Sequence, residues 1–191
     1  MGTLTHLSLG TNLGNRLDNF RLALRLIQEK CGKIITLSKI YETPALGFES
    51  EDDFLNMCIS VQTELDPRSL LNALQLIEIE MGRTSKSIDG TYVSRVIDLD
   101  IILYGKKIIK TKELVLPHPR YKERLFVLVP LNDILKKFKD PENQKSLTAI
   151  KKEDQLMGMM YFFGGFILMA IGLNMLIGPI TTLLEFIPVL G

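Results

Sequence analysis

The chain has 191 residues and a formal net charge of +1 at pH 7, and 46% of its residues are hydrophobic. This length suits one ordinary domain with a further segment, and a charge near zero argues against a nucleic-acid-binding surface. Its two cysteines, Cys31 and Cys58, lack the spacing of a zinc site or a disulfide framework. The first residues lack the basic and apolar regions of a secretory signal, so we expect a cytoplasmic domain.

The first predicted elements are a strand, a turn and a helix. Residues 4–9 form a short apolar run, and residues 17–29 carry apolar side chains at helical spacing. The turn between them, residues 10–15, has neither of the common phosphate-loop motifs, which favours a structural role over phosphate binding. We expect the buried stripe of the helix to contain Leu17, Phe20, Leu24 and Ile27.

A second and a third strand are predicted over residues 34–41 and 54–64, joined by a loop that Pro44 interrupts. The third strand alternates, so its odd-numbered residues should face the core and its even-numbered residues the other side. Phe54 and Asn56 then lie at a loop mouth, where a ring and an amide could hold a planar heterocycle. A partly covered surface phenylalanine is the alternative.

A second helix is predicted to begin at Asp66-Pro67, an N-cap followed by proline at the first helical position, and to end at Gly82. A polar loop over residues 84–94 then separates Arg83 from Arg95. This loop could be a lid or a plain surface loop. The buried seam of the helix should contain Leu70, Leu74, Ile77 and Met81.

Residues 95–104 predict a strand on which a site could form. Asp98 and Asp100 should share one face, roughly 7 Å apart, because alternate side chains of a strand point the same way. Two such carboxylates repel each other unless a cation or a proton compensates, and Mg²⁺ suits one or two carboxylates combined with phosphates. Arg95 adds a donor matched to phosphate. Solvated surface aspartates are the alternative. The opposite face should carry Ile97, Leu99, Ile101 and Leu103.

Short strands are predicted next, over residues 107–109 and 114–116. His118 follows between two prolines, where it could be a rigid turn residue or a donor to phosphate. A helix is predicted from about Lys122, with Pro130 near the start of a second helix.

These elements together define a fold class. The order strand, helix, strand, strand, helix, strand over residues 4–104 is that of the ferredoxin-like βαββαβ pattern of α+β domains. We expect one such domain over residues 1–135, with extra short strands and C-terminal helices. A polar linker over residues 136–155 and an apolar segment over residues 156–191 should follow.

The apolar segment begins with a charge-free run, residues 156–178, which is long enough to cross a bilayer core of about 30 Å as a helix. Lys151 and Lys152 precede it and would place its start on the cytoplasmic side, anchoring the domain to the inner face of the membrane. Its sequence is similar to a fragment of a multi-span membrane protein of the LUMA type. A buried C-terminal helix of a soluble domain is the alternative.

Six motifs carry a resemblance over about residues 5–135: LGTNLGNR, YETPALG, DDFLNM, IEIEMGR, SRVIDLDIILYG and LPHPRYKERLFVLVPL. In this order and spacing they resemble the 6-hydroxymethyl-7,8-dihydropterin pyrophosphokinases of folate biosynthesis. The resemblance implies transfer of diphosphate from ATP to the hydroxymethyl group of a reduced pterin, with release of AMP.

The resemblance also implies roles for individual residues. Asp98 and Asp100 would hold two Mg²⁺ ions, and Arg83 and Arg95 would be catalytic residues that meet the phosphates. The pterin-binding residues would be Thr43, Pro44, Leu46, Phe54, Asn56 and Phe126. The nucleotide-binding residues would be Gln75, Glu78, Arg83, Arg95, Ile101, His118 and Arg124.

The chain departs from the family pattern at three positions, one of them a predicted site residue. Phe54 replaces a common tyrosine, Pro119 replaces a common aromatic residue, and Glu113 stands where a basic nucleotide contact can occur. We expect these differences to alter nucleotide affinity and turnover and to leave the reaction class unchanged.

Two other functions fit the same residues. Paired strand aspartates on a ferredoxin-like sheet also serve metal-dependent nucleotidyl transferases, which would release pyrophosphate in place of AMP. The chain could also be a non-catalytic, membrane-anchored ligand-binding module in which the aspartate pair is structural.

Overall fold

The computed structural model describes residues 2–44, 53–83, 94–135, 139–143, 145, 146 and 149. The chain divides into two units, Met1–Lys151 and Lys152–Gly191, and all the described residues belong to the first. The predicted apolar segment, residues 156–191, therefore lies outside the described residues. Within the described part of the chain, no helix combines the length and apolar character needed to cross a membrane.

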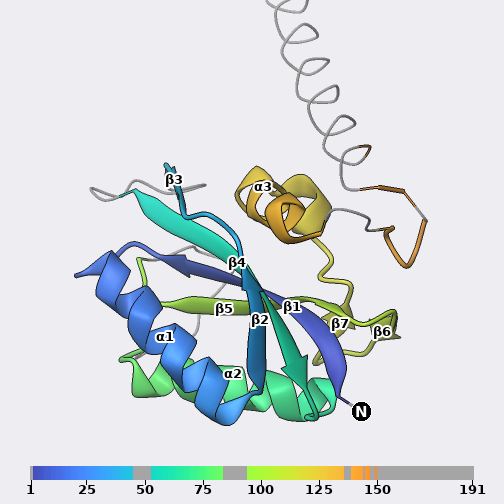
Figure 1. Cartoon of the computed structure of the whole chain (residues 1–191), viewed down its shortest axis with the longest axis horizontal. Helices are drawn as coiled ribbons and strands as arrows, with labels where there is room; N and C mark the ends of the chain where they lie inside the picture. The colour runs from blue at the N-terminus through green and yellow to red at the C-terminus, as the bar shows by residue number, and fades with distance from the viewer. Residues whose placement is uncertain are drawn as a thin grey trace, which may run out of the picture. The chain divides into compact units, whose positions relative to one another are not determined.

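A five-stranded antiparallel sheet forms the centre of the fold (Figure 1). Its main path runs β2-β4-β1-β5, made of β2 (Lys33–Leu37), β4 (Phe54–Thr63), β1 (Thr3–Thr11) and β5 (Asp98–Tyr104). β3 (Tyr41–Thr43) pairs with the first residues of β4. Because β4 lies between β1 and β2, the strands show the split arrangement of the predicted βαββαβ pattern, and this part of the fold prediction is confirmed.

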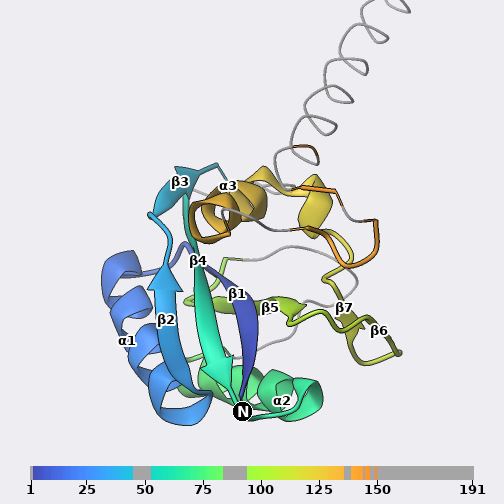
Figure 2. The ribbon, with the colours of Figure 1, turned by 45° about the vertical axis from the view of Figure 1, so that its right-hand side comes forward.

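Two helices cover one face of the sheet and a third covers the other (Figures 1 and 2). α1 (Arg16–Lys30) and α2 (Pro67–Glu80) lie on the first face, and α3 (Leu125–Ile134) lies on the second. The caps follow from the sequence: the Asn15 side chain accepts the Asp18 N–H, and the Asp66 side chain accepts two N–H groups of the first turn of α2. As predicted, α2 buries Leu70, Leu74 and Ile77 completely and Met81 almost completely.

The buried stripe of α1 differs from the predicted one. Phe20 and Ile27 are buried as expected, but Leu17 is 48% exposed. Ala23 and Leu26 complete the buried face, which also fits helical spacing and lets a small residue approach the sheet closely. The second predicted strand, residues 34–41, is likewise divided, because residues 38–40 separate β2 from β3.

β5 begins at Asp98 and carries an irregularity that the alternating pattern did not predict. Ile97, Leu99 and Ile101 lie in the core beneath α1 and α2, as expected. The prediction for Leu103 was wrong, since Leu103 packs with Ile102 in the cluster beneath α3. The register with β1 shifts between His6 and Leu7, which leaves Ile102 as an extra residue and reverses the alternation after it.

Short elements follow β5 in the described part of the chain. β6 (Ile109–Lys110) and β7 (Val115–Leu116) pair with each other, and a 3₁₀ turn, η1 (Tyr121–Glu123), leads into α3. Pro130 lies inside α3 and does not begin a second helix. Asp140, in the segment predicted to be a polar linker, is fully buried.

Candidate active site

A pocket opens on the α3 face of the sheet, at the edge where β5 begins. It brings together nearly all the predicted pterin-binding residues and most of the predicted metal and phosphate residues. Leu46, the remaining predicted pterin-binding residue, lies outside the described residues. The lining consists of Ser8, Gly10, Thr43, Pro44, Phe54, Asn56, Arg95, Asp98, Asp100, Arg124 and Phe126.

Asp98 is held by two arginines. Its Oδ1 accepts a hydrogen bond from Arg95 Nη1 at 2.6 Å and lies 3.4 Å from Arg83 Nη1. The arginine side chains are only 12% and 19% exposed, so these charge-assisted contacts are shielded from water. The predicted phosphate arginines thus lie beside the predicted metal carboxylate.

Asp100 lies one alternation further along β5, on the same face. Its Oδ2 lies 3.8 Å from Arg124 Nη1. Burial and the neighbouring charge of Asp98 raise the pKa of Asp100, and Arg124 only partly opposes them. When the pKa of a carboxyl group is raised, a nearby cation stabilises its ionised form. The aspartate pair therefore provides an electrostatic reason for a metal ion here.

The donor set fits Mg²⁺. The described part of the chain contains no group of three or more His, Cys, Asp or Glu side chains that could hold a metal. Asp98 and Asp100 are hard oxygen ligands at the rim of a pocket, and Mg²⁺ commonly takes one or two carboxylates and completes its shell with water and substrate phosphates. These two residues would hold the ion.

Glu78, predicted to bind nucleotide, lies behind the aspartate pair. It is 5% exposed, its Oε1 accepts the Leu99 N–H at 2.8 Å, and its Oε2 lies 2.5 Å from Arg83 Nη1. Burial raises the pKa of Glu78, and these two contacts oppose the shift. Glu78 therefore fixes the β5 backbone between the two aspartates and orients Arg83.

Two aromatic rings and an amide form the other side of the pocket. Phe54 comes from β4 and Phe126 from α3, and both line the pocket. Asn56 is 4% exposed and its Nδ2 donates to Thr43 Oγ1 at 2.9 Å, which fixes the amide. Arg124 lies 5.6 Å above the Phe126 ring, within cation–π range.

Sequence reasoning missed two lining residues on β1, Ser8 and Gly10. A Cβ at Gly10 would lie 3.4 Å from Asn56 Oδ1 and 3.9 Å from Phe54 Cδ1, so a larger side chain would fill this part of the pocket. The alternation of β1 could have revealed both, because Leu7 and Leu9 face the core and their neighbours must face the aspartates.

Asn12 was also missed, in the turn that we interpreted as structural. It is fully buried, its Oδ1 accepts the Arg95 N–H at 2.8 Å, and its own N–H donates to the Arg95 carbonyl at 3.2 Å. Its Nδ2 donates to Ser94 Oγ at 2.9 Å. The turn is structural in the sense predicted, and its role is to fix the backbone of a site arginine.

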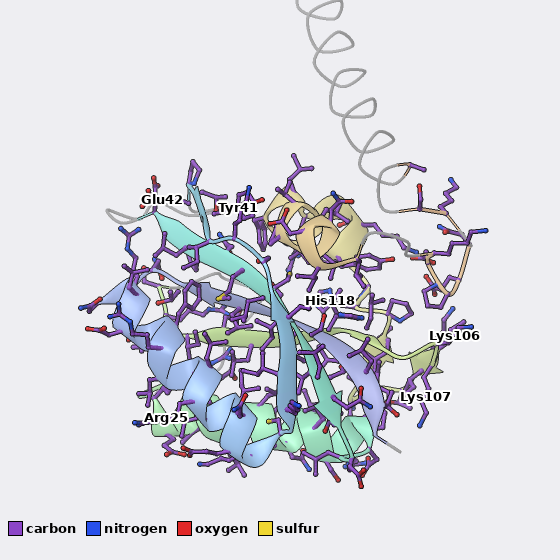
Figure 3. The ribbon with its side chains drawn as sticks, in the orientation of Figure 1. Arg25, Tyr41, Glu42, Lys106, Lys107 and His118 are labelled. Carbon is purple, nitrogen blue, oxygen red and sulfur yellow. The ribbon has the colours of Figure 1, made fainter. Side chains whose placement is uncertain are left out.

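His118 follows β7 and lies on the side of the sheet that α3 covers (Figure 3). Its Nδ1 accepts the Arg120 N–H at 3.2 Å, and its own N–H donates to the Ile102 carbonyl at 3.0 Å. Burial and the charges of Arg124 and Arg120 lower the pKa of His118 to about 4. A neutral ring with Nδ1 as acceptor carries its proton on Nε2, which can donate.

Of the predicted nucleotide-binding residues, Arg95 and Arg124 line this pocket, and Gln75, Glu78, Arg83, Ile101 and His118 do not. The Ile101 side chain is 4% exposed and lies in the core, so only its backbone could reach a ligand. Gln75 lines a second groove between α2 and the β6–β7 pair, together with Glu113, which forms a 2.7 Å ion pair with Arg68.

Comparison with known proteins identifies the family. The family described as 7,8-dihydro-6-hydroxymethylpterin-pyrophosphokinase matches residues 6–136. The chain belongs to this family. The pterin pyrophosphokinase family and enzyme class predicted from the sequence are thereby confirmed.

Individual relatives agree with the family match. The chain is 45% identical over 134 residues to the 2-amino-4-hydroxy-6-hydroxymethyldihydropteridine pyrophosphokinase of Porphyromonas gingivalis, covering 69% of this chain and 90% of that one. It is 42% identical over 135 residues to the enzyme of the same name from Bacillus subtilis, covering 70% of this chain and 79% of that one.

A solved structure supports the fold. The chain is similar to Plasmodium falciparum HPPK-DHPS with a TM-score of 0.67 and 18% identity, over 84% of this chain. It spans 47% of the length of that protein. The mixed α/β fold with an antiparallel sheet is therefore confirmed as that of the pterin pyrophosphokinases.

Proposed function

We propose that this chain transfers the β,γ-diphosphate of ATP to the hydroxymethyl group of 6-hydroxymethyl-7,8-dihydropterin and releases AMP. The observation that carries the proposal is the single pocket in which Asp98 and Asp100 lie with Phe54, Phe126 and Asn56. Family membership supplies the reaction, and the pocket supplies both a place for a planar ring and charges for a polyphosphate.

The aromatic side of the pocket would bind the pterin. Phe54 and Phe126 would contact the two faces of the ring, and Asn56 would present its Oδ1 to a ring N–H while Nδ2 remains on Thr43. Pro44 would close one edge of the ring. This placement directs the hydroxymethyl group toward the aspartate pair, where the phosphates must lie for an in-line displacement.

Arginines and acidic residues would hold the phosphates. Bound at Asp98 and Asp100, two Mg²⁺ ions would neutralise phosphate charge and polarise the attacked phosphorus centre. Arg95 and Arg83 would exchange part of their contact with Asp98 for phosphate oxygens, and Glu78 would keep Arg83 oriented during that exchange. Neutral His118 would donate from Nε2 to a phosphate oxygen without repelling the neighbouring arginines.

The groove that contains Gln75 would receive the base of the nucleotide. The groove lies between α2 and β6–β7, and the side-chain amide of Gln75 can form hydrogen bonds with the edge of a heterocycle. Arg68 and Glu113, which form an ion pair, both line this groove. A basic residue is absent from position 113, so we expect a weaker contact with the nucleotide than a lysine or arginine would give there.

Product analysis tests the reaction. With Mg²⁺, ATP and the hydroxymethyl dihydropterin, the chain should form AMP and pterin diphosphate in equal amounts, and ATP should remain intact without the pterin. Release of pyrophosphate would instead indicate a nucleotidyl transferase. Binding of both substrates without turnover would indicate a ligand-binding module, and in that case Asp98→Ala should leave nucleotide affinity in Mg²⁺ unchanged.

We also propose that residues 156–191 attach the catalytic domain to the cytoplasmic side of a membrane. The proposal rests on the charge-free run 156–178 and on the preceding Lys151 and Lys152. The full chain should remain in the membrane fraction after alkaline extraction, and a chain ending at Ala149 should appear in the supernatant. Recovery of both in the supernatant would contradict it.

A further inference from the structure

The segment that follows α3 returns to the domain through one buried carboxylate. Asp140 is fully buried, accepts a hydrogen bond from the Tyr121 hydroxyl and lies 3.0 Å from Lys122 Nζ. It also accepts the backbone N–H groups of Glu142 at 2.8 Å and Asn143 at 3.0 Å. A buried carboxylate is costly unless it is paired and hydrogen-bonded, and here both oxygens have partners.

The two side chains that contact Asp140 come from the turn that directly precedes Arg124. Tyr121 and Lys122 form η1, and Tyr121 is fully buried in the cluster beneath α3. The Tyr121 N–H donates to the His118 carbonyl at 3.2 Å, and the Arg124 carbonyl accepts the N–H groups of Val127 and Leu128 at 2.9 Å each. η1 thus connects His118 directly to Arg124, the first residue before α3.

Arg124 follows this turn directly in the chain. Its guanidinium lies 3.8 Å from Asp100 and above the Phe126 ring, so a small rotation of η1 would displace it from both. Asp140 lies beyond residue 136, where the family match ends. The anchor of the turn therefore comes from outside the matched part of the chain.

We propose that Asp140 is a positioning residue, which fixes η1 through Tyr121 and Lys122 and thereby holds Arg124 beside Asp100. This inference rests on the proposed function and deepens it. Asp140 touches no substrate; it acts on the nucleotide and phosphates only through the arginine.

A double-mutant cycle on the full chain tests the proposal. Asp140→Ala should lower kcat/KM for ATP by roughly 10-fold or more at a temperature where circular dichroism shows the variant to be folded. In an Arg124→Ala background the same change should alter kcat/KM by less than about 2-fold, because the group that Asp140 positions is gone. Equal losses in both backgrounds would overturn the proposal and leave Asp140 a purely structural residue.

Two further variants keep the test sharp. Glu142→Gln is the matched control, because Glu142 contacts the same Lys122 at 2.9 Å but is partly exposed, and it should behave as the wild type. If Asp140→Ala does not fold, Tyr121→Phe removes only the hydroxyl that Asp140 accepts from and should show the same non-additivity with Arg124→Ala. Full activity of both single variants, Tyr121→Phe and Asp140→Asn, would also overturn the proposal.

The readout separates this inference from the proposed function. If the wild type forms no AMP, the proposed reaction fails, and the cycle is then read from the dissociation constant of Mg·ATP measured by calorimetry. Non-additive binding losses would still support a positioning role, and additive ones would still exclude it.

Discussion

The two faces of the sheet differ in what they bury. On the α1–α2 face, β1, β4 and β5 contribute a continuous apolar layer in which Leu7, Ile59 and Leu99 are at most 5% exposed. On the α3 face the apolar cluster is smaller, and beside it the same strands present Ser8, Asn56 and Asp100 to a pocket. One face therefore supplies folding free energy and the other holds the polar groups needed for chemistry. Substitutions on the two faces should separate stability from activity.

The largest effect is expected on the pocket face, from Asp100→Asn. Removing this charge should lower kcat by about 10²- to 10³-fold, the loss typical of one preorganised electrostatic contact. The raised pKa of Asp100 means that its ionised form is disfavoured in the folded chain. The free energy of unfolding at neutral pH should therefore rise in the variant. Urea titration without Mg²⁺ measures this free energy of unfolding. A lower value in the variant would show that the ionised Asp100 side chain does not destabilise the folded chain.

A substitution on the apolar face should do the reverse. Leu74→Ala in α2 removes a fully buried side chain and should lower the free energy of unfolding by about 2 to 5 kcal/mol. The kcat of the folded fraction should not change. Ile79→Ala on the same helix is the control, because Ile79 is 62% exposed and should cost less than about 0.5 kcal/mol. A fall in kcat for Leu74→Ala would mean that the two faces are coupled.

The pocket face should also be the acid-sensitive one, and His6 allows a test. His6 is 6% exposed, its Nδ1 lies 2.9 Å from Ser60 Oγ, and burial lowers its pKa to about 4. Below the ordinary histidine pKa of about 6.5 the unfolded chain takes up a proton that the folded chain does not, so stability falls with pH down to about 4. The loss due to His6 between about pH 7 and pH 5 should be about 2 kcal/mol.

His6→Asn keeps a polar partner for Ser60 and removes the titration. Unfolding of the variant by urea at both pH values should show a pH dependence smaller by that amount. An unchanged dependence would assign the acid sensitivity to other groups, His118 among them.

The smallest effect is expected from a substitution of Phe54, one of the two aromatic residues that line the pocket. Phe54→Leu keeps an apolar side chain but removes the ring, and should raise the KM for the pterin by roughly 2- to 10-fold, the range of an aromatic stacking contact. Phe54→Tyr restores the ring and should stay near the wild type. Steady-state kinetics at saturating ATP measures both. If leucine and tyrosine behaved alike, the pterin would not stack on this ring.

Local alternation allowed much of the site to be predicted. Period-two patterning of β4 and β5 placed Phe54 with Asn56 and Asp98 with Asp100 on the face opposite the core, and the structure brings these pairs into one pocket. The motif resemblance identified the family and its reaction class.

Features that depend on register between distant strands could not be predicted. The extra residue at Ile102 arises from the pairing of β5 with β1, and no local pattern in β5 marks it. The same applies to the packing of α2 on β5, which places Glu78 behind Asp98 and in contact with Arg83 and the Leu99 N–H. Asp140 lies in a segment whose polar composition indicated only solvent exposure.

The extra residue at Ile102 divides β5 into two parts whose α3-facing side chains differ in character. Before it, the side of the strand toward α3 carries acidic groups, and after it that side carries Leu103. Deleting Ile102 would leave Leu103 opposite His6 and Tyr104 opposite Thr5, because only the unpaired residue is lost. Tyr104, whose hydroxyl donates to the Leu65 carbonyl, would keep its place on the other face. A strand one residue shorter would thus remove one apolar side chain from the cluster beneath α3, while the other core residues and both aspartates stayed where they are.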